Sequence, residues 1–248
     1  MGKLPRAPDR VGRARRRGGF WGFVRGLLVF MVSAVVVVPP LWVLAYRYVP
    51  PPMTFLMLER VIEGYGVDHR WRPISRIAPA MTHAAIAAED AQFCRHHGFD
   101  LAAIDKALRH DERRRARLRG GSTISQQTAK NVFLWPGRSW LRKGVEAWFT
   151  VLIESFWGKR RIMEVYLNTV EMGPGVYGVE AAARRNFGVT AAELTPGEAS
   201  RLAAVLPSPL KWSALDPGPY VLRRSGRIDA SQGTVRADGL ADCVLRTR

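Results

Sequence analysis

Cysteine is scarce in this sequence, with only Cys94 and Cys243 among 248 residues. Two isolated cysteines do not form the paired spacing of a structural zinc site, so the sequence excludes that class of metal protein. An oxidising exterior compartment would permit a disulfide between them. Because Cys243 lies in a segment with little apolar periodicity, we expect two separate thiols instead.

Acidic side chains are also few. The 21 Asp and Glu residues stand against 38 Lys and Arg, which gives a net charge of +17 at pH 7. This balance favours an anionic partner, such as nucleic acid, acidic lipid headgroups or a pyrophosphate-linked lipid. No basic run is interleaved with aromatic residues as in a nucleic-acid-binding motif, so we expect no nucleic acid partner. A membrane-tethered basic protein that binds nucleic acid or scaffolds a division complex is an alternative from another class.

The sequence lacks any alternating apolar and polar run long enough to predict a convincing β-strand. Its apolar residues recur instead at helical spacing. Residues 141–157 carry apolar side chains at helical spacing, and Ile162, Val165 and Tyr166 share one face of a second helix. Thr195 starts a capping box with proline at the first helical position. We therefore expect a mainly α-helical fold without internal repeats.

One apolar run, residues 26–45, contains no charged residue and is long enough to cross the ~30 Å hydrocarbon core of a bilayer. Arginines precede it, which predicts a cytoplasmic N-terminus. Pro39 and Pro40 predict a kink or an early end of the helix. A cleaved signal peptide and a buried core helix are the alternatives, but the run is too long for the first and apolar on all sides, unlike the second. Aromatic residues near its ends are predicted interfacial anchors: Trp21, Trp42, Tyr46 and Tyr48.

The segment AAEDAQFCRHHGFD, residues 87–100, places two adjacent carboxylates, Glu89 and Asp90, at the end of an alanine-rich helical run. Neighbouring residues on a helix cannot face the same way, so one carboxylate can point into a cleft while the other anchors structure. The simpler alternative is that both are surface carboxylates at a helix end.

A second segment, GGSTISQQTAKN, follows at residues 120–131. A helix that begins near Ser122 puts Thr123, Gln127 and Lys130 on one stripe, and its N-terminus offers N–H groups to an anion. A capped helix explains the serine and threonine equally well. It does not explain two glutamines, a lysine and Asn131 together.

The third segment, RSWLRKGVE, supplies Arg138, Arg142, Lys143 and Glu146. Arg142 and Glu146 are one helical turn apart. An exposed ion pair that contributes ~0.3–0.5 kcal/mol would account for that spacing without any function.

Together these segments resemble the motifs of the family 51 glycosyltransferases, the peptidoglycan polymerases that extend glycan strands from lipid II. The resemblance implies a lysozyme-like helical domain in which Glu89 is the general base. It implies that Glu146 assists departure of undecaprenyl diphosphate or holds a divalent cation, Mg²⁺ or Mn²⁺. The implied substrate-binding residues are Asp90, Phe93, His96, Ser122, Thr123, Gln127, Lys130, Asn131, Arg138 and Arg142.

Composition, the apolar run and the resemblance together predict how the chain is organised. We expect a basic cytoplasmic tail at residues 1–19, one transmembrane helix at 20–48 and a periplasmic glycosyltransferase domain at 49–222, anchored in the bacterial inner membrane. Residues 223–248 depart from the family pattern and are expected to form a divergent, disordered tail or to reflect a shifted reading frame. Expected partners are lipid II, the nascent glycan strand and proteins of cell-wall synthesis or division.

A lysozyme-like or lytic enzyme that cleaves glycan is the second enzymatic interpretation. Such an enzyme needs an acid placed at an existing glycosidic bond. The lysine and arginine side chains of the second and third segments favour the polymerase, because cations suit a departing diphosphate.

Overall fold

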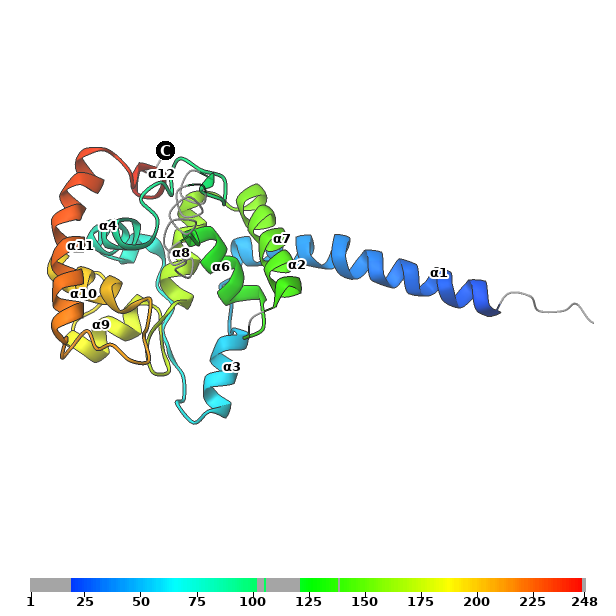
Figure 1. The fold of residues 1–248 in the computed structure, drawn as a ribbon, viewed down its shortest axis with the longest axis horizontal. Coiled ribbons are helices and arrows are strands. Elements are labelled where there is room, and N and C mark those ends of the chain that lie inside the picture. The colour runs from blue at the N-terminus through cyan, green and yellow to red at the C-terminus, as the bar shows by residue number, and fades with distance from the viewer. Residues whose placement is uncertain (1–18, 102–104, 106–120, 138, 247–248) are drawn as a thin grey trace, which may run out of the picture. The chain divides into compact units, whose positions relative to one another are not determined.

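The computed structural model describes residues 19–101, 105, 121–137 and 139–246. Residues 1–18 of the predicted tail at 1–19 and the predicted site residue Arg138 lie outside this part of the chain. The described residues are mainly helical, as expected, with three short strands (Figure 1). The chain divides into two compact units, residues 1–41 and 42–248.

The N-terminal helix consists of α1 (Gly19–Val32), a π-helical segment (Ser33–Val37) and α2 (Val38–Tyr48). Phe20–Tyr48 is long and apolar enough to cross a membrane. The helix does not end at Pro39 or Pro40. Immediately before them the Val38 N–H bonds to the Ser33 carbonyl, and this wider turn leaves room for proline rings that a regular α-helix would exclude.

The second unit begins at Trp42 and not at the predicted residue 49. Trp42 meets Phe133 edge to face at 5.2 Å between ring centroids, and Tyr46 stacks on the same ring at 5.9 Å. The Trp157 indole N–H donates to the Val43 carbonyl at 2.7 Å. Trp42 and Tyr46 thus pack partly against protein, whereas Trp21 and Tyr48 are exposed.

The remaining helices of this unit form two packed groups. One contains α4 (Pro79–Glu89), α10 (Pro196–Val205) and α11 (Pro219–Ala237), and the other contains α6 (Ile124–Phe133), α7 (Trp140–Phe156) and α8 (Lys159–Thr169). Figure 1 shows α11, coloured orange to red, beside α10 and α4. The predicted helices at 141–157 and around Ile162 are confirmed by α7 and α8, and the predicted capping box by Thr195.

The smaller elements are α3 (Phe55–Ile62), a 3₁₀ turn (Ile74–Arg76), α9 (Val179–Phe187) and α12 (Asp242–Leu245). The three strands β1 (Asp68–His69), β2 (Glu171–Gly173) and β3 (Val176–Tyr177) form one sheet in the order β1-β3-β2. β3 pairs parallel to β1 and antiparallel to β2. The sheet joins the segment after α3 to the segment after α8.

The C-terminal segment is folded, so the prediction of a disordered tail is wrong for the described residues 223–246. Helix α11 buries Val221, Ile228 and Val235. The chain then turns into α12, where Cys243 forms a disulfide with Cys94 at a Cα–Cα distance of 5.7 Å. The expectation of two separate thiols is therefore also wrong, because the fold returns the C-terminal segment to the loop that follows Glu89 and Asp90.

A buried carboxylate, Glu180 of α9, ties three segments together. It accepts hydrogen bonds from Arg72 at 2.9 Å, from Arg184 at 2.6 Å and from the Ala191 N–H at 2.8 Å. Burial alone would raise the pKa of Glu180, but these hydrogen bonds outweigh it and lower the pKa from 4.5 to about 2. The ionised carboxylate is therefore a part of the folded structure.

This pKa predicts a pH-dependent stability. Because the folded-state pKa lies below the ordinary value, the contribution of Glu180 is complete above pH 4.5 and is lost as the pH falls towards 2. The shift corresponds to about 3 kcal/mol. Chemical unfolding of the detergent-solubilised chain at pH 6 and pH 3 should show a smaller loss of stability in Glu180→Gln than in the wild type. Glu59→Gln, at a side chain that is 37% exposed, is the control, and an equal loss in wild type and Glu180→Gln would contradict the assignment.

Candidate active site

Asp90 is the anchoring member of the carboxylate pair. It follows the last residue of α4, and its buried side chain accepts a hydrogen bond from the Ile124 N–H at 2.9 Å. Both carboxylate oxygens lie 3.0 Å from His96 Nε2, while His96 Nδ1 accepts from the Gly98 N–H at 3.1 Å. Since Nδ1 is an acceptor, Nε2 carries the proton and donates it to Asp90. These bonds fix the end of α4 to the start of α6.

The start of α6 is built by a capping box. Thr123 is the N-cap, its side chain accepts from the Gln126 N–H, and the Gln126 side chain accepts from the Thr123 N–H. The Thr123 hydroxyl also donates to the Gly98 carbonyl at 2.6 Å. Gly98 has φ +91°, and a Cβ there would lie 2.8 Å from Thr150 Cγ2. The glycine is needed both for its backbone conformation and for the close approach of α7.

Glu89 is the less buried member of the pair. Both carboxylates line a pocket of about 290 Å³, together with Gln92, Ser122 and Thr123. The Glu89 side chain, 14% exposed, accepts from Gln127 Nε2 at 3.0 Å and from Arg224 Nη2 at 3.1 Å. The expected division of roles between the two carboxylates therefore agrees with the geometry.

The surroundings of Glu89 make it a better proton acceptor than an ordinary glutamate. Burial raises the pKa of Glu89, and the nearby Asp90 carboxylate acts in the same direction. The hydrogen bond from Gln127 and the charges of Arg224 and Lys130 lower the pKa without reversing the shift. A carboxylate with a raised pKa that borders a pocket is the usual arrangement of a general base.

The second acidic residue, Glu146 of α7, is buried with 3% of its surface exposed. Lys143 donates a hydrogen bond to one carboxylate oxygen, and Arg142 Nη1 lies 3.8 Å from the other. Because Glu146 is buried, this is not the exposed surface ion pair that the spacing alone allowed. Burial of a charge requires compensation, which the two cations supply.

Lys130 of α6 links the two acidic residues. Its side chain is exposed. Protein atoms nevertheless surround its ammonium group, and this partial desolvation lowers the pKa of Lys130. The charge of Glu146 opposes this shift, Arg142 and Lys143 reinforce it, and Glu89 opposes it again. Lys130 therefore lies within electrostatic range of both carboxylates, and Gln127, one helical turn earlier, bonds directly to Glu89.

Not every predicted site residue reaches a ligand surface. Phe93 is fully buried beneath Lys159, whose Nζ lies 4.6 Å from the ring centroid, so the prediction that Phe93 binds substrate is wrong. Asn131 is also buried. Asp90, His96 and Thr123 are held by the bonds described above. Ser122, Lys130 and Arg142 keep accessible surface.

The surroundings of Glu146 do not fit a divalent cation. Among the described residues, no group of three or more His, Cys, Asp or Glu side chains is placed to hold a metal ion. Glu146 instead faces Lys143, Arg142 and, at longer range, Lys130. Three cations around one carboxylate favour binding of an anion over binding of a divalent cation.

Two residues near Glu89, Arg224 and Tyr166, were not predicted to belong to the site. Arg224 comes from α11, the segment expected to be disordered, and bonds to Glu89 across 135 positions. Tyr166, predicted only to share one face of the second helix with Ile162 and Val165, is fully buried, and its hydroxyl donates to Gln127 Oε1 at 3.4 Å. That bond turns the Gln127 amide so that its NH₂ faces Glu89.

The sequence is similar to those of known proteins over most of its length. A sequence model described as transglycosylase matches residues 57–230 of this chain. A biosynthetic peptidoglycan transglycosylase of Caulobacter vibrioides is 58% identical over 234 residues, which cover 94% of this chain and 100% of that protein. A protein of the same name from Pseudomonas aeruginosa is 55% identical over 226 residues, covering 89% of this chain and 94% of that protein.

A third relative with this name, from Rhodospirillum centenum, is 50% identical over 221 residues, which cover 89% of this chain and 92% of that protein. The family match begins within α3 and ends within α11. It thus contains the carboxylate pair, the capped helix α6, Glu146 and Arg224. This chain belongs to the transglycosylase family.

Proposed function

We propose that this chain is a membrane-anchored peptidoglycan glycosyltransferase that polymerises lipid II into β-1,4-linked glycan strands. The observation that carries the proposal is the pairing of a buried carboxylate that borders a pocket, Glu89, with the cation group Lys130, Arg142 and Lys143 beside Glu146. The family membership and the names of the relatives support the same activity.

In the proposed reaction, the Glu89 carboxylate accepts the proton of the 4-hydroxyl of the acceptor sugar. The freed oxygen attacks the anomeric carbon of the donor from the face opposite the diphosphate, so the new bond has inverted configuration. The bond between that carbon and the diphosphate oxygen breaks, and undecaprenyl diphosphate leaves with the electron pair. A base of raised pKa suits this step because it binds the transferred proton more firmly.

The cations act on the leaving group. Lys130 and Arg142 are proposed to bind the diphosphate, whose negative charge grows as the sugar bond breaks. Glu146 assists this departure by holding Arg142 and Lys143 in place from beneath. The requirement for Mg²⁺ or Mn²⁺ stays a prediction.

We further propose that the protein is anchored in the bacterial inner membrane. Phe20–Tyr48 supplies one helix that is long and apolar enough to span it. The arginines before this helix favour a cytoplasmic N-terminus, which places the catalytic unit in the periplasm.

A direct assay tests the activity. Purified full-length protein is incubated with labelled lipid II, with added Mg²⁺ or Mn²⁺ or with a chelator, and the products are separated on a gel. A ladder of glycan strands is expected. A glycan-cleaving enzyme would instead clear purified cell wall in a zymogram and leave lipid II unchanged, an outcome that would overturn the polymerase assignment.

The pH profile gives a second prediction for the same site. Glu89 must be ionised to act as a base. As the pH falls, a Glu89 with a raised pKa becomes protonated earlier, and activity is lost at a higher pH than with an ordinary glutamate. Arg224→Ala removes a charge that lowers this pKa. The acid limb of kcat/KM for strand synthesis should therefore move to higher pH in that variant. Arg223→Ala, at the exposed neighbouring position, should leave the limb in place, and equal profiles in all three proteins would contradict the contact's role.

A further inference from the structure

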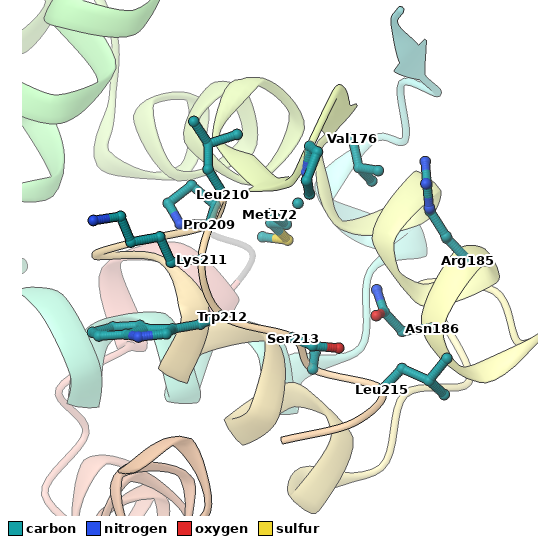
Figure 2. A pocket seen from close by; sticks show the side chains of 13 residues that line it. Met172, Val176, Arg185, Asn186, Pro209, Leu210, Lys211, Trp212, Ser213 and Leu215 are labelled. Carbon is teal, nitrogen blue, oxygen red and sulfur yellow. The ribbon is translucent and has the colours of Figure 1, made fainter. Parts of the chain in front are cut away.

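A pocket of about 340 Å³, lined by α9 and the loop 209–215, does not explain how Glu89 is held (Figure 2). Figure 2 shows the Lys211 side chain directed away from the other lining residues. The two side chains that bond to Glu89, Gln127 and Arg224, are not among those residues. The groups that fix Glu89 therefore lie elsewhere, in the interior of the helical unit.

One buried carboxylate, Glu154 of α7, takes no part in the proposed reaction. Its side chain is 8% exposed. Lys159 of α8 donates to Glu154 Oε1 at 2.7 Å, and the fully buried Ser125 of α6 donates its hydroxyl proton to the same oxygen. A buried carboxylate is costly unless it is paired, so these two bonds fix the side chain of Glu154. Glu154 thereby joins the first turns of α6 and α8, which pack together (Figure 1).

Ser125 lies in the first turn of α6, two positions before Gln127. Successive residues of an α-helix project about 100° apart, so side chains two positions apart point to nearly opposite sides. Gln127 accordingly bonds to Glu89 on one side of α6, and Ser125 bonds to Glu154 on the other. The bond to Glu154 thus resists a rotation of α6 about its axis, which would turn the Gln127 amide away from Glu89.

The pair of Glu154 and Lys159 also supports the loop that follows Glu89. Lys159 Nζ lies 4.6 Å from the ring centroid of the buried Phe93, a cation–π contact within this loop's packing. A Cβ at Gly98 would lie 3.2 Å from Glu154 Cγ, so the backbone of the loop packs closely on the Glu154 side chain. The pair therefore contacts both segments that meet at Glu89, the loop and α6.

We propose that Glu154 is a positioning residue: through Ser125 it sets the rotation of α6 and so holds the Gln127 amide against Glu89. The proposal rests on the proposed function, because it takes Glu89 as the base of the reaction. Lys159 compensates the charge of Glu154. A purely stabilising Glu154 would instead change the free energy of unfolding and leave the titration of Glu89 unaltered.

The titration of Glu89 reports the position of the Gln127 amide. The charged or titratable groups that act on Glu89 or respond to its charge are Asp90, Arg224, Lys130 and Tyr166. Burial raises the pKa of Glu89, and the hydrogen bond from Gln127 lowers it in part. If the amide turns away while the other groups stay, the pKa of Glu89 rises further.

The test variant is Ser125→Ala, which removes the link to α6 and keeps the pair of Glu154 and Lys159. The matched control is Ser155→Ala, at an exposed serine of α7. The titration of Glu89 is followed by NMR of detergent-solubilised full-length protein labelled at its glutamate carboxyl carbons, with Glu89→Gln to assign the signal. The pH dependence of kcat and KM for strand synthesis and the thermal midpoint are measured in parallel.

Two double variants test the acceptor without leaving an unpaired buried charge. Glu154→Gln with Lys159→Met keeps an oxygen that can accept from Ser125, whereas Glu154→Met with Lys159→Met removes it. A third double variant, Ser125→Ala with Gln127→Ala, shows whether the effect of Ser125 passes through Gln127.

Ser125→Ala is expected to lower kcat about tenfold with KM unchanged, because the base is misplaced and not the substrate. The Glu89 titration and the acid limb of kcat/KM should both move to higher pH. Ser125→Ala should lower kcat no further once Gln127→Ala is present. Glu154→Gln with Lys159→Met should stay closer to the wild type than Glu154→Met with Lys159→Met.

Equal Glu89 titrations in the wild type, Ser125→Ala and Ser155→Ala would overturn the proposal. So would a lower thermal midpoint of Ser125→Ala with unchanged kinetics, or a further loss of activity when it is combined with Gln127→Ala. If Ser125→Ala does not fold, the comparison of the two Lys159→Met variants decides. If the wild type makes no strands, the proposed function fails, while the Glu89 titration still decides whether Ser125 holds the Gln127 amide in place.

Discussion

Glu89→Gln is expected to lower the rate of glycan-strand synthesis by about 10²–10⁴-fold, because loss of a general base has effects of this size. Glutamine keeps the volume of the side chain, and its single oxygen can still accept a hydrogen bond from one of the two donors, Gln127 or Arg224. It cannot accept the proton of the acceptor hydroxyl. Since a neutral amide also avoids the unfavourable burial of a charge, the fold should be retained.

The measurement is the initial rate of strand synthesis from labelled lipid II by detergent-solubilised full-length protein. Circular dichroism and the thermal midpoint show whether the variant is folded. Glu59→Gln, the same substitution at a half-exposed position of α3, should keep wild-type activity. A folded Glu89→Gln protein with a rate near that of the wild type would sink the assignment of Glu89 as the base.

Removal of the Cys94–Cys243 disulfide should have the largest effect on stability. The bond joins residues separated by 149 positions, so its reduction frees a very long loop in the unfolded chain. By the loop-entropy argument this lowers the free energy of unfolding by up to about 5 kcal/mol. The contact between α12 and α8 should weaken first, because Cys243 lies in α12 and Arg160 of α8 donates to the Val244 carbonyl there.

Denaturant unfolding of the full-length protein, with and without a reducing agent, tests this expectation. The wild type should lose stability on reduction. Cys94→Ser with Cys243→Ser should start at the lower stability and be insensitive to the reducing agent. If wild-type midpoints agree under both conditions, and mass spectrometry confirms that the bond was reduced, the disulfide does not stabilise the fold as expected.

Some of the site could be predicted because its signals are local in sequence. The capping box at Thr123 depends on residues three positions apart, and the stripe of Gln127 and Lys130 follows from the helical repeat. The opposite orientations of Glu89 and Asp90 likewise follow from their adjacency at the end of a helix. Such patterns need only the geometry of one helix.

The helix that carries Arg224 escaped prediction for a physical reason. The buried positions of α11 are Val221, Ser225, Ile228, Gln232 and Val235, spaced four and three residues apart as in an amphipathic helix. Two of the five are polar, so the apolar pattern is broken at alternate turns. Gln232 can be buried because its amide donates to the Pro196 carbonyl at 2.9 Å and to the Ser200 hydroxyl at 2.7 Å, partners that only the folded chain supplies.

Sequence patterns predict the helical class, the apolar helix near the N-terminus, the start of α6 near Ser122 and the family to which the chain belongs. The pairing of Cys94 with Cys243, the burial of Glu146 among cations and the contact of Arg224 with Glu89 follow from how the helices pack in three dimensions. Local periodicity reports how one segment lies against its surroundings. Contacts across 135 or 149 positions depend instead on how all the helices pack together, and no short stretch of sequence contains that information.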